Sequence, residues 1–196
     1  MRIVIATPLY PPEIGGPATY VTALERGLPL RGIQVEVVKF SDVRHWPKLF
    51  RHYAYYCRVL EAARGADMIL ALDPVSVGLP AMWAAKKLGK KFVVKVVGDY
   101  AWEQGTQRFG ITESLDDFVK RQRVPFPVRM LRTIETRVAS SASRVIVPSQ
   151  YLKNVVMEWG IGEQQIAVVY NGIALPLSTT PPTNRPHGFL IVSVGR

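Results

Sequence analysis

The most constraining feature of this chain is a repeated alternation between short apolar runs and longer segments with helical spacing. The first run, from Arg2 to Thr7, is rich in β-branched residues and precedes prolines, as is typical of a buried strand. Strands that alternate with helices in this way form a parallel sheet with helices on both faces. The sequence therefore predicts an α/β fold with a Rossmann-like parallel sheet. Further strands are expected at residues 33–40, 67–72, 91–97, 144–147 and 166–170.

Helices are expected between these strands, and the helix at residues 47–63 has the clearest pattern. Tyr55 is expected on its outer side, together with several basic residues. The stretch after Gly98 is less regular as far as Pro127, apart from a short helix that starts at Ser114. The buried face of the 47–63 helix is predicted from the helical spacing of Leu49, Tyr53, Tyr56 and Leu60. The remaining helices are expected at residues 17–30, 75–88, 128–138 and 149–159.

Near its end the chain changes composition. Residues 1–173 read as one domain, and residues 174–188 are rich in proline, serine and threonine, as is typical of a linker. Residues 189–196 are strongly apolar and are interpreted as the first strand of a second, truncated domain. The alternative is an extra strand of the first domain.

Composition limits the class of protein. The formal net charge is +10, and the basic residues concentrate at 44–64, 86–95 and 120–144. Such segments attract phosphates of nucleotides, nucleic acid or an anionic membrane, or they form solvated helix faces. The single cysteine, Cys57, excludes an intramolecular disulfide and is expected to be a small buried hydrophobe. With no apolar segment long enough to span a bilayer, the chain is predicted to be cytoplasmic.

Two adjacent glycines lie between the first strand and the first helix. Gly15 and Gly16 allow close approach of a ligand to the backbone, and the helix start behind them offers free N–H groups to an anion. An ordinary turn is the alternative interpretation. The glycine-rich dinucleotide motif, the P-loop, the HExxH metal motif and the serine-hydrolase elbow are all absent. We therefore expect no metal and no cofactor.

A second group of polar and aromatic residues follows the strand at residues 91–97. Asp99 is predicted to be catalytic, because it comes directly after a glycine at the end of a strand. Tyr100, Trp102 and Glu103 are predicted to bind an acceptor, since carboxylates and aromatic rings suit sugar hydroxyls and sugar rings. The alternatives are that Asp99 caps a turn and that Trp102 fills the core.

In their order and spacing, these segments resemble the family 4 (group 1) retaining glycosyltransferases of the GT-B fold. The resemblance covers the whole chain. It is carried by Pro11-Pro12…Gly15-Gly16, Gly98-Asp99-Tyr100, Val147-Pro148-Ser149-Gln150, Tyr170-Asn171-Gly172 and Val194-Gly195-Arg196.

The resemblance implies two Rossmann-like domains that face each other across a cleft, of which this chain supplies the amino-terminal, acceptor-side one. Gly15, Gly16 and Arg196 would bind the donor diphosphate, and a guanidinium suits phosphate oxygens. The implied reaction transfers sugar from a nucleotide-sugar donor to an acceptor hydroxyl with retention of configuration and without a metal. Three further residues would lie in loops at the cleft, namely Ser149, Asn171 and Gly172.

The chain departs from the family pattern at three places. Gly98 stands where the family often has histidine, and Ala174 stands where it usually has aspartate. The paired glutamates of the second domain are absent because the sequence ends. We therefore expect this fragment to hold half of an active site and to be inactive alone.

The remaining expectations concern the partners of the protein and the alternative functions. The acceptor is expected to be a sugar or a lipid-linked sugar in cell-envelope polysaccharide or glycolipid synthesis. The basic helix is expected to dock on an anionic membrane through Lys48, Arg51 and Arg58, or else to be a solvated face. The alternatives are another nucleotide-sugar enzyme, such as an epimerase, and a basic nucleic-acid-binding module, but no nucleic-acid motif is present.

Overall fold

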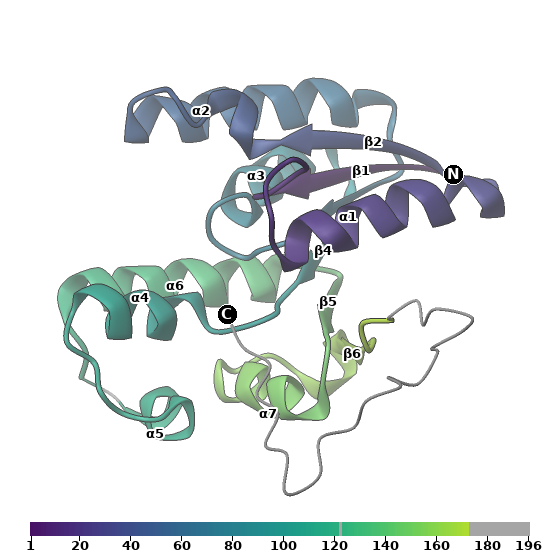
Figure 1. Ribbon diagram of the computed structural model, residues 1–196. Coiled ribbons are helices and arrows are strands. Elements are labelled where there is room, and N and C mark those ends of the chain that lie inside the picture. Colours follow the sequence, from purple (N-terminus) through teal and green to yellow (C-terminus); the bar gives the residue numbers. More distant parts are fainter. Residues whose placement is uncertain (122, 173–196) are drawn as a thin grey trace, which may run out of the picture.

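The computed structural model describes residues 1–121 and 123–172, in which six strands form one parallel sheet (Figure 1). The strand order is β2-β1-β3-β4-β5-β6. The predicted α/β, Rossmann-like fold is thus confirmed. The expected linker at residues 174–188, the expected strand at 189–196 and Arg196 lie outside the described residues. The strands are β1 (Arg2–Thr7), β2 (Gln34–Lys39), β3 (Met68–Ala71), β4 (Lys91–Lys95), β5 (Arg144–Val147) and β6 (Ile166–Val168).

The direction in which the chain adds strands to the sheet reverses at β1. Ile3 of β1 pairs with Val35 of β2 on one side and with Met68 of β3 on the other. The chain thus moves outward from β1 to β2, then crosses back and continues from β3 to β6. Ligands of open parallel sheets bind beyond the carboxyl ends of strands at such a switch point.

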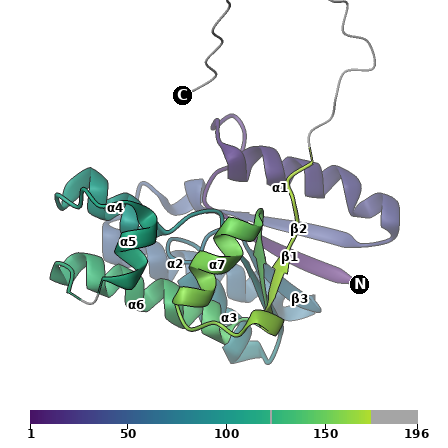
Figure 2. The ribbon, with the colours of Figure 1, turned by 90° about the horizontal axis from the view of Figure 1, so that it is seen from below.

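Of the helices in the described residues, α1 (Gly16–Gly27) is by itself against one face of the sheet, opposite most of the others (Figures 1 and 2). Its buried Val21 packs with Ile5, Leu70 and Val93, which are the residues that β1, β3 and β4 turn toward this face. The other face packs against α2 (Lys48–Ala62), α3 (Gly78–Leu88), α6 (Phe126–Ser141) and α7 (Gln150–Glu158). Right-handed crossovers explain the division, because only the β1-to-β2 connection runs in the opposite direction along the sheet.

Two further helices lie beyond β4, and only one of them was predicted. Helix α5 (Leu115–Lys120) begins after Ser114, whose hydroxyl accepts from the Asp117 N–H at 3.3 Å, and this confirms the short helix. Helix α4 (Tyr100–Arg108) occupies a stretch that was expected to be irregular. Its sequence contains good helix formers such as Ala101 and Glu103, but Gly105 lies mid-helix, where a Cβ would approach Ile111 Cγ1 to 2.9 Å. Packing of Ala101 against Val128 of α6, together with the Asp99 cap, stabilises α4 despite this glycine.

The prediction for the buried face of α2 was wrong at two tyrosines. Tyr55 is completely buried, and its hydroxyl donates to the Val38 carbonyl at 2.7 Å. Tyr53 is instead 67% exposed. The predicted burial of Cys57 is likewise wrong, because its side chain is exposed on the same helix. Tyr55 can be buried because β2 supplies an acceptor for its hydroxyl, which helical spacing alone does not show.

Some boundaries also differ from the predictions. The first helix ends at Gly27 and is followed by a separate 3₁₀ turn, since Pro29 cannot donate to a continued α-helix. Among the described residues, no helix combines the length and apolar character needed to cross a membrane. The 3₁₀ turns are Pro29–Arg31, Phe40–Val43, Ala63–Gly65 and Glu163–Gln165.

Candidate functional site

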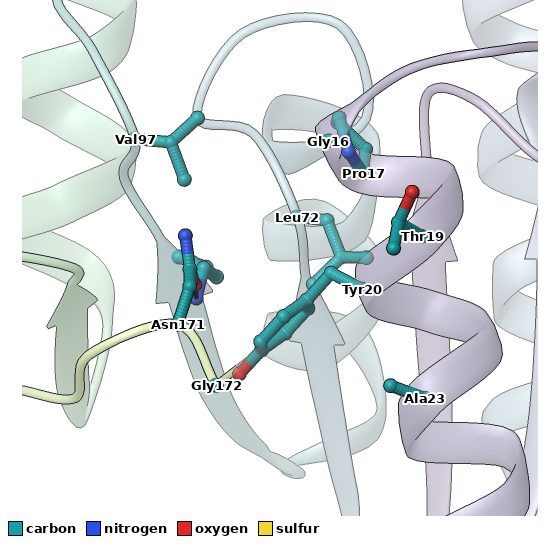
Figure 3. A pocket seen from close by; sticks show the side chains of 10 residues that line it. Gly16, Pro17, Thr19, Tyr20, Ala23, Leu72, Val97, Asn171 and Gly172 are labelled. Atoms are coloured by element: carbon teal, nitrogen blue, oxygen red, sulfur yellow. Dashed lines mark hydrogen bonds between the residues drawn. The ribbon is translucent and has the colours of Figure 1, made fainter. Parts of the chain in front are cut away.

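A cavity of about 360 Å³ opens at the switch point, between the start of α1 and the carboxyl ends of β3 and β4. In Figure 3 Thr19 and Ala23 of α1 lie on one side of it and Asn171 on the other, with the Tyr20 ring between them. The lining residues are Gly16, Pro17, Thr19, Tyr20, Ala23, Leu72, Lys95, Val97, Asn171 and Gly172.

The start of α1 meets the cavity without a side-chain cap. Gly15 is the N-cap residue and Pro17 follows in the first turn, which contains no acidic residue. A Cβ on Gly16 would meet nothing within 4 Å, so the backbone here is open to the cavity. The free N–H groups and the positive end of the helix dipole are suited to an anionic group.

Lys95 supplies the positive charge of the cavity. Strand alternation places Lys95 beside Val93 on the face that carries α1, and its side chain is only 2% exposed. Its ammonium donates to Asn171 Oδ1 at 2.8 Å and lies 3.6 Å from the centre of the Tyr20 ring. Burial lowers the pKa of Lys95, because the charged form loses hydration.

The structure brings three of the predicted residues together. Gly16 is far in the sequence from Asn171 and Gly172, and all three line the same cavity. Gly15 lies directly beside it, and a Cβ there would approach Leu9 Cδ1 to 2.6 Å. The proposed roles of these residues in phosphate binding and at the cleft stay predictions, as does that of Arg196.

Asp99 lies outside the lining of this cavity, in a second group of carboxyl groups. It is 1% exposed, and its Oδ1 accepts from the Trp102 N–H at 2.7 Å, which makes Asp99 the N-cap of α4. Its Oδ2 accepts from the indole N–H of Trp159 at 3.2 Å. The capping alternative is thus observed, and a catalytic role for Asp99 stays a prediction.

Glu135 of α6 completes this group and is fully buried. Its Oε2 accepts from the Tyr100 and Ala101 N–H groups at 3.1 and 3.4 Å, whereas its Oε1 is buried without a partner among the described residues. Burial and the neighbouring Asp99 raise the pKa of Glu135 well above its ordinary value. A proton on Glu135 can therefore bridge the two carboxyl groups, an arrangement that supports the start of α4.

The other residues predicted to bind the acceptor lie on α4. The indole N–H of Trp102 donates to the Glu113 carbonyl at 2.9 Å, and its ring packs beside Phe118, as the core alternative for this residue proposed. Glu103 is close to Gly98, where a Cβ would meet Glu103 Oε1 at 2.4 Å. Tyr100 is half-buried. None of these α4 side chains lines the cavity.

Ser149 has a structural role and lies outside the cavity lining. Its hydroxyl accepts from the Leu152 N–H at 3.2 Å and caps α7. Within the described residues, no three His, Cys, Asp or Glu side chains are arranged to hold a metal ion.

Sequence inspection missed Lys95 and Tyr20 as candidates. Lys95 was grouped with the basic residues at 86–95, but Lys86, Lys87 and Lys91 are exposed while Lys95 is buried. A usable signal was present, because a lysine that follows three apolar residues at the carboxyl end of a strand lies where ligands of parallel sheets bind.

Solved structures with the same fold include enzymes of two kinds. HepE from Anabaena, solved with UDP and glucose, has a TM-score of 0.59 and 16% identity over 88% of this chain and 45% of its own. The lipopolysaccharide outer core galactosyltransferase WaaB has a TM-score of 0.53 and 20% identity over 94% of this chain and 50% of its own. The UDP-GlcNAc 2-epimerase from Methanocaldococcus jannaschii has a TM-score of 0.57 and 15% identity over 86% of this chain and 45% of its own.

These likenesses define the class of fold, a Rossmann-like half of a GT-B glycosyltransferase architecture. The chain spans about half the length of the structures that it resembles, or slightly less. No curated protein matches the sequence at the significance threshold. The family model described as Glycosyltransferase Family 4 matches residues 14–175, and the chain belongs to that family.

Proposed function

We propose that this chain is the acceptor-side half of a retaining glycosyltransferase that moves a sugar from a nucleotide-sugar donor to an acceptor hydroxyl. The family match over residues 14–175 is the observation that carries the proposal. The site supports it, because an uncapped helix start and a buried lysine line one cavity at the switch point of the sheet. HepE, a structure of the same fold, was solved with UDP and glucose.

The cavity is suited to stabilise the leaving group of such a reaction. The bond between the sugar and the diphosphate breaks, and the diphosphate leaves with the electron pair. The acceptor oxygen forms the new bond, and its proton passes to an oxygen of the departing diphosphate. Negative charge therefore grows on the diphosphate. The backbone N–H of Gly16 is a fixed dipole and the ammonium of Lys95 is a positive charge, and both favour this change. Arg196, outside the described residues, would add a guanidinium.

A second domain is part of the proposal. The chain covers only 44 to 50% of the similar structures, so the nucleoside and the paired glutamates of the family would be bound or supplied elsewhere. We accordingly expect the 196-residue chain alone to be inactive. As the family resemblance implies, the complete enzyme is expected to need no metal.

The experiment supplies a panel of nucleotide-sugars and sugar or lipid-linked acceptors to the protein that carries this chain together with its donor-binding domain. Nuclear magnetic resonance of the product identifies the anomeric configuration. The proposal predicts a glycoside with retained configuration, including in the presence of a chelator. An inverted product, or no transfer to any acceptor, would contradict it.

A second candidate is a nucleotide-sugar epimerase, which the likeness to the UDP-GlcNAc 2-epimerase favours. The same assay separates the two functions. An epimerase converts the nucleotide-sugar without any acceptor, whereas a transferase needs the acceptor and releases the nucleotide. Conversion of the donor in the absence of an acceptor would establish the epimerase.

The proposal also places the protein on the cytoplasmic face of an anionic membrane, and the start of α2 supports this. Three aromatic side chains at helical spacing, Trp46, Phe50 and Tyr53, are 47, 64 and 67% exposed. Arg58, one of the predicted contacts, pairs with Asp42 at 3.0 Å. Exposed aromatic rings beside basic residues are typical of helices that lie at a lipid interface.

Sedimentation with vesicles tests this docking. The double variant Phe50→Ser, Tyr53→Ser should bind anionic vesicles several-fold more weakly, since it removes apolar surface that would enter the lipid. Phe126→Ser on α6 is the matched control, because Phe126 is also 67% exposed. Equal binding of the double variant and the control would refute docking through α2.

A further inference from the structure

A hollow of about 430 Å³ lies along the exposed side of α6, and we call it the α6 groove. Arginine and threonine side chains supply most of its lining. No acid is among the described residues that line it, and the single acid of α6, Glu135, is fully buried at the start of α4. The lining residues are Val124, Arg129, Arg132, Thr133, Thr136 and Arg137.

Two of the three arginines in the α6 groove present their charge to solvent. Arg129 and Arg137 are exposed, and the ion pairs among the described residues include neither of them. Arg132 is held by the protein instead, because its guanidinium donates to the Phe118 and Arg121 carbonyls, both at 2.7 Å. Carbonyl groups are neutral and do not cancel its charge. The groove as a whole therefore attracts anions.

A hollow of similar size beside β2 shows the contrast with a surface that compensates its own charge. Its volume is about 440 Å³, and it also contains two arginines. Arg2 pairs there with Glu36 at 2.5 Å, and Arg58 pairs with Asp42 at 3.0 Å. These carboxylates line the same hollow and offset its positive charge, whereas the described lining of the α6 groove offers no such partner.

The α6 groove is on the side of the protein at which the strands end. Glu135 is flanked in sequence by groove residues, and its carboxylate accepts from the Tyr100 N–H at 3.1 Å, just past the end of β4. The earlier turns of α6 therefore run beside α4, beyond the sheet (Figure 1). Ligands of open parallel sheets bind beyond this edge, so the reacting end of an acceptor in the proposed reaction lies on the same side.

The side chains of the groove suit a sugar chain that carries negative charges. A guanidinium binds the oxygens of a carboxylate or phosphate in a fork, and threonine hydroxyls can bond to sugar hydroxyls. At a rise of about 1.5 Å per residue, Arg129 and Arg137 lie about 12 Å apart along the helix, far enough to contact charges on different sugar units. The exposed ring of Phe126, over which Arg129 lies at 5.5 Å, adds an apolar surface for a sugar ring.

We propose that the α6 groove binds an acidic oligosaccharide portion of the acceptor, and that Arg129 and Arg137 pair with its carboxylate or phosphate groups. A glycosyltransferase acts on such a chain as its acceptor, so the groove proposal rests on the proposed function. Val124 is the only apolar side chain of the lining among the described residues. A groove of this kind fits a polar chain that enters it better than the apolar interior of a membrane.

Calorimetric titration of the 196-residue chain with hexagalacturonate tests the groove. The double variant Arg129→Gln, Arg137→Gln should weaken binding about tenfold or more, because it removes both exposed guanidiniums. The matched control is Arg31→Gln, Arg64→Gln, which removes the same charge from two exposed arginines just before β2 and β3. The control should stay within about twofold of the wild type, since salt screens charges at the far edge of the sheet.

Two further oligosaccharides define what the groove recognises. Maltohexaose, which is neutral and of equal length, should bind much more weakly than hexagalacturonate. Pentamannosyl phosphate presents phosphate in place of carboxylate. Binding of either acidic oligosaccharide that depends on the two arginines supports the proposal, and the tighter of the two identifies the anionic group.

Amide chemical shifts of the wild-type chain provide a readout that needs no variant. The acidic oligosaccharide should move the signals of Thr133 and Thr136 first. No binding of either acidic oligosaccharide, unchanged affinity in the double variant, or equal binding of maltohexaose would overturn the proposal. Tighter binding of a single-stranded oligonucleotide or of anionic vesicles through the same arginines would also overturn it.

Kinetics of the protein that also carries the donor-binding domain separate the groove from the proposed function. With an acidic acceptor, the double variant should raise KM several-fold with a much smaller effect on kcat, because the groove binds substrate and transition state alike. Arginine-dependent oligosaccharide binding without any sugar transfer would contradict the proposed function alone. Transfer to acidic acceptors with a KM that does not depend on these arginines would contradict the groove alone.

Discussion

Trp159 donates its indole N–H to the carboxylate of Asp99 at 3.2 Å and thereby joins the end of α7 to the start of α4. Asp99 accepts at the same time from the Trp102 N–H and lies against the buried Glu135. The three helices α4, α6 and α7 thus meet at one carboxyl pair. These contacts hold α4 in place beyond the end of β4, although Gly105 lies in the middle of the helix.

Removal of the indole donor should destabilise the domain. Trp159→Phe leaves Asp99 Oδ2 buried without that partner, so we expect the free energy of unfolding to fall by about 1–3 kcal/mol. Urea denaturation followed by circular dichroism measures the change. Trp83→Phe is the control, because Trp83 is 44% exposed and should cost much less. Equal losses in the two variants would show that the bond to Asp99 contributes nothing.

Stability should depend on pH through Asp73, which follows β3 and accepts from the Val75 and Ser76 N–H groups at 2.6 Å. Burial raises the pKa of Asp73 from 3.8 to about 6. The folded state therefore keeps a proton that the unfolded state releases, and its stability is full at low pH and falls as pH rises through about 6.

Asp73→Asn removes this titration and should raise stability above neutral pH by up to about 3 kcal/mol relative to the wild type, the equivalent of the pKa shift. Its amide oxygen can still accept from both N–H groups. Denaturation curves between pH of about 4 and about 8 measure the difference. A variant with the same pH slope as the wild type would show that Asp73 is not the titrating group.

Glu135→Gln tests the shared proton in the carboxyl pair. The glutamine amide N–H can donate to Asp99 while its oxygen accepts from the Tyr100 N–H, as the protonated glutamate does. Because the pKa of Glu135 is raised, the wild type should lose more stability than the variant as pH rises; the part of the loss that is due to Asp73 remains in both. The variant should therefore match the wild type at low pH and exceed it at high pH. Greater loss of stability in the variant at high pH would count against a proton on Glu135.

Gly78 should not tolerate a side chain. A Cβ at this position would lie 2.4 Å from the Asp73 carbonyl oxygen and 3.2 Å from Val138 Cγ1, so α3 would have to move. We expect Gly78→Ala to cost about 1–3 kcal/mol in the free energy of unfolding. Gly162→Ala, where nothing lies within 4 Å, should cost little in the same denaturation assay. A Gly78→Ala variant as stable as Gly162→Ala would contradict the close approach of α3 to Asp73.

The sequence by itself determined the order of the strands, that of the helices apart from α4, and the position of the Gly15-Gly16 loop after β1. These features depend on local patterns, namely β-branched runs, helical spacing, and glycine or proline at element ends, which each segment carries independently of the rest of the chain. The short helix after Ser114 was predictable for the same reason, because its cap is three residues from the group that it binds.

Only the tertiary structure decided which of the candidate residues share a site. Lys95 became a cavity residue because β4 turns it toward α1, and Asn171 meets it across 76 positions of sequence. Tyr55 was buried because Val38 accepts from its hydroxyl, and Asp99 became a cap because α6 and α7 bring Glu135 and Trp159 to it. Burial and pairing of polar groups depend on the partners that other elements supply, and a pattern within one segment carries no information about those partners.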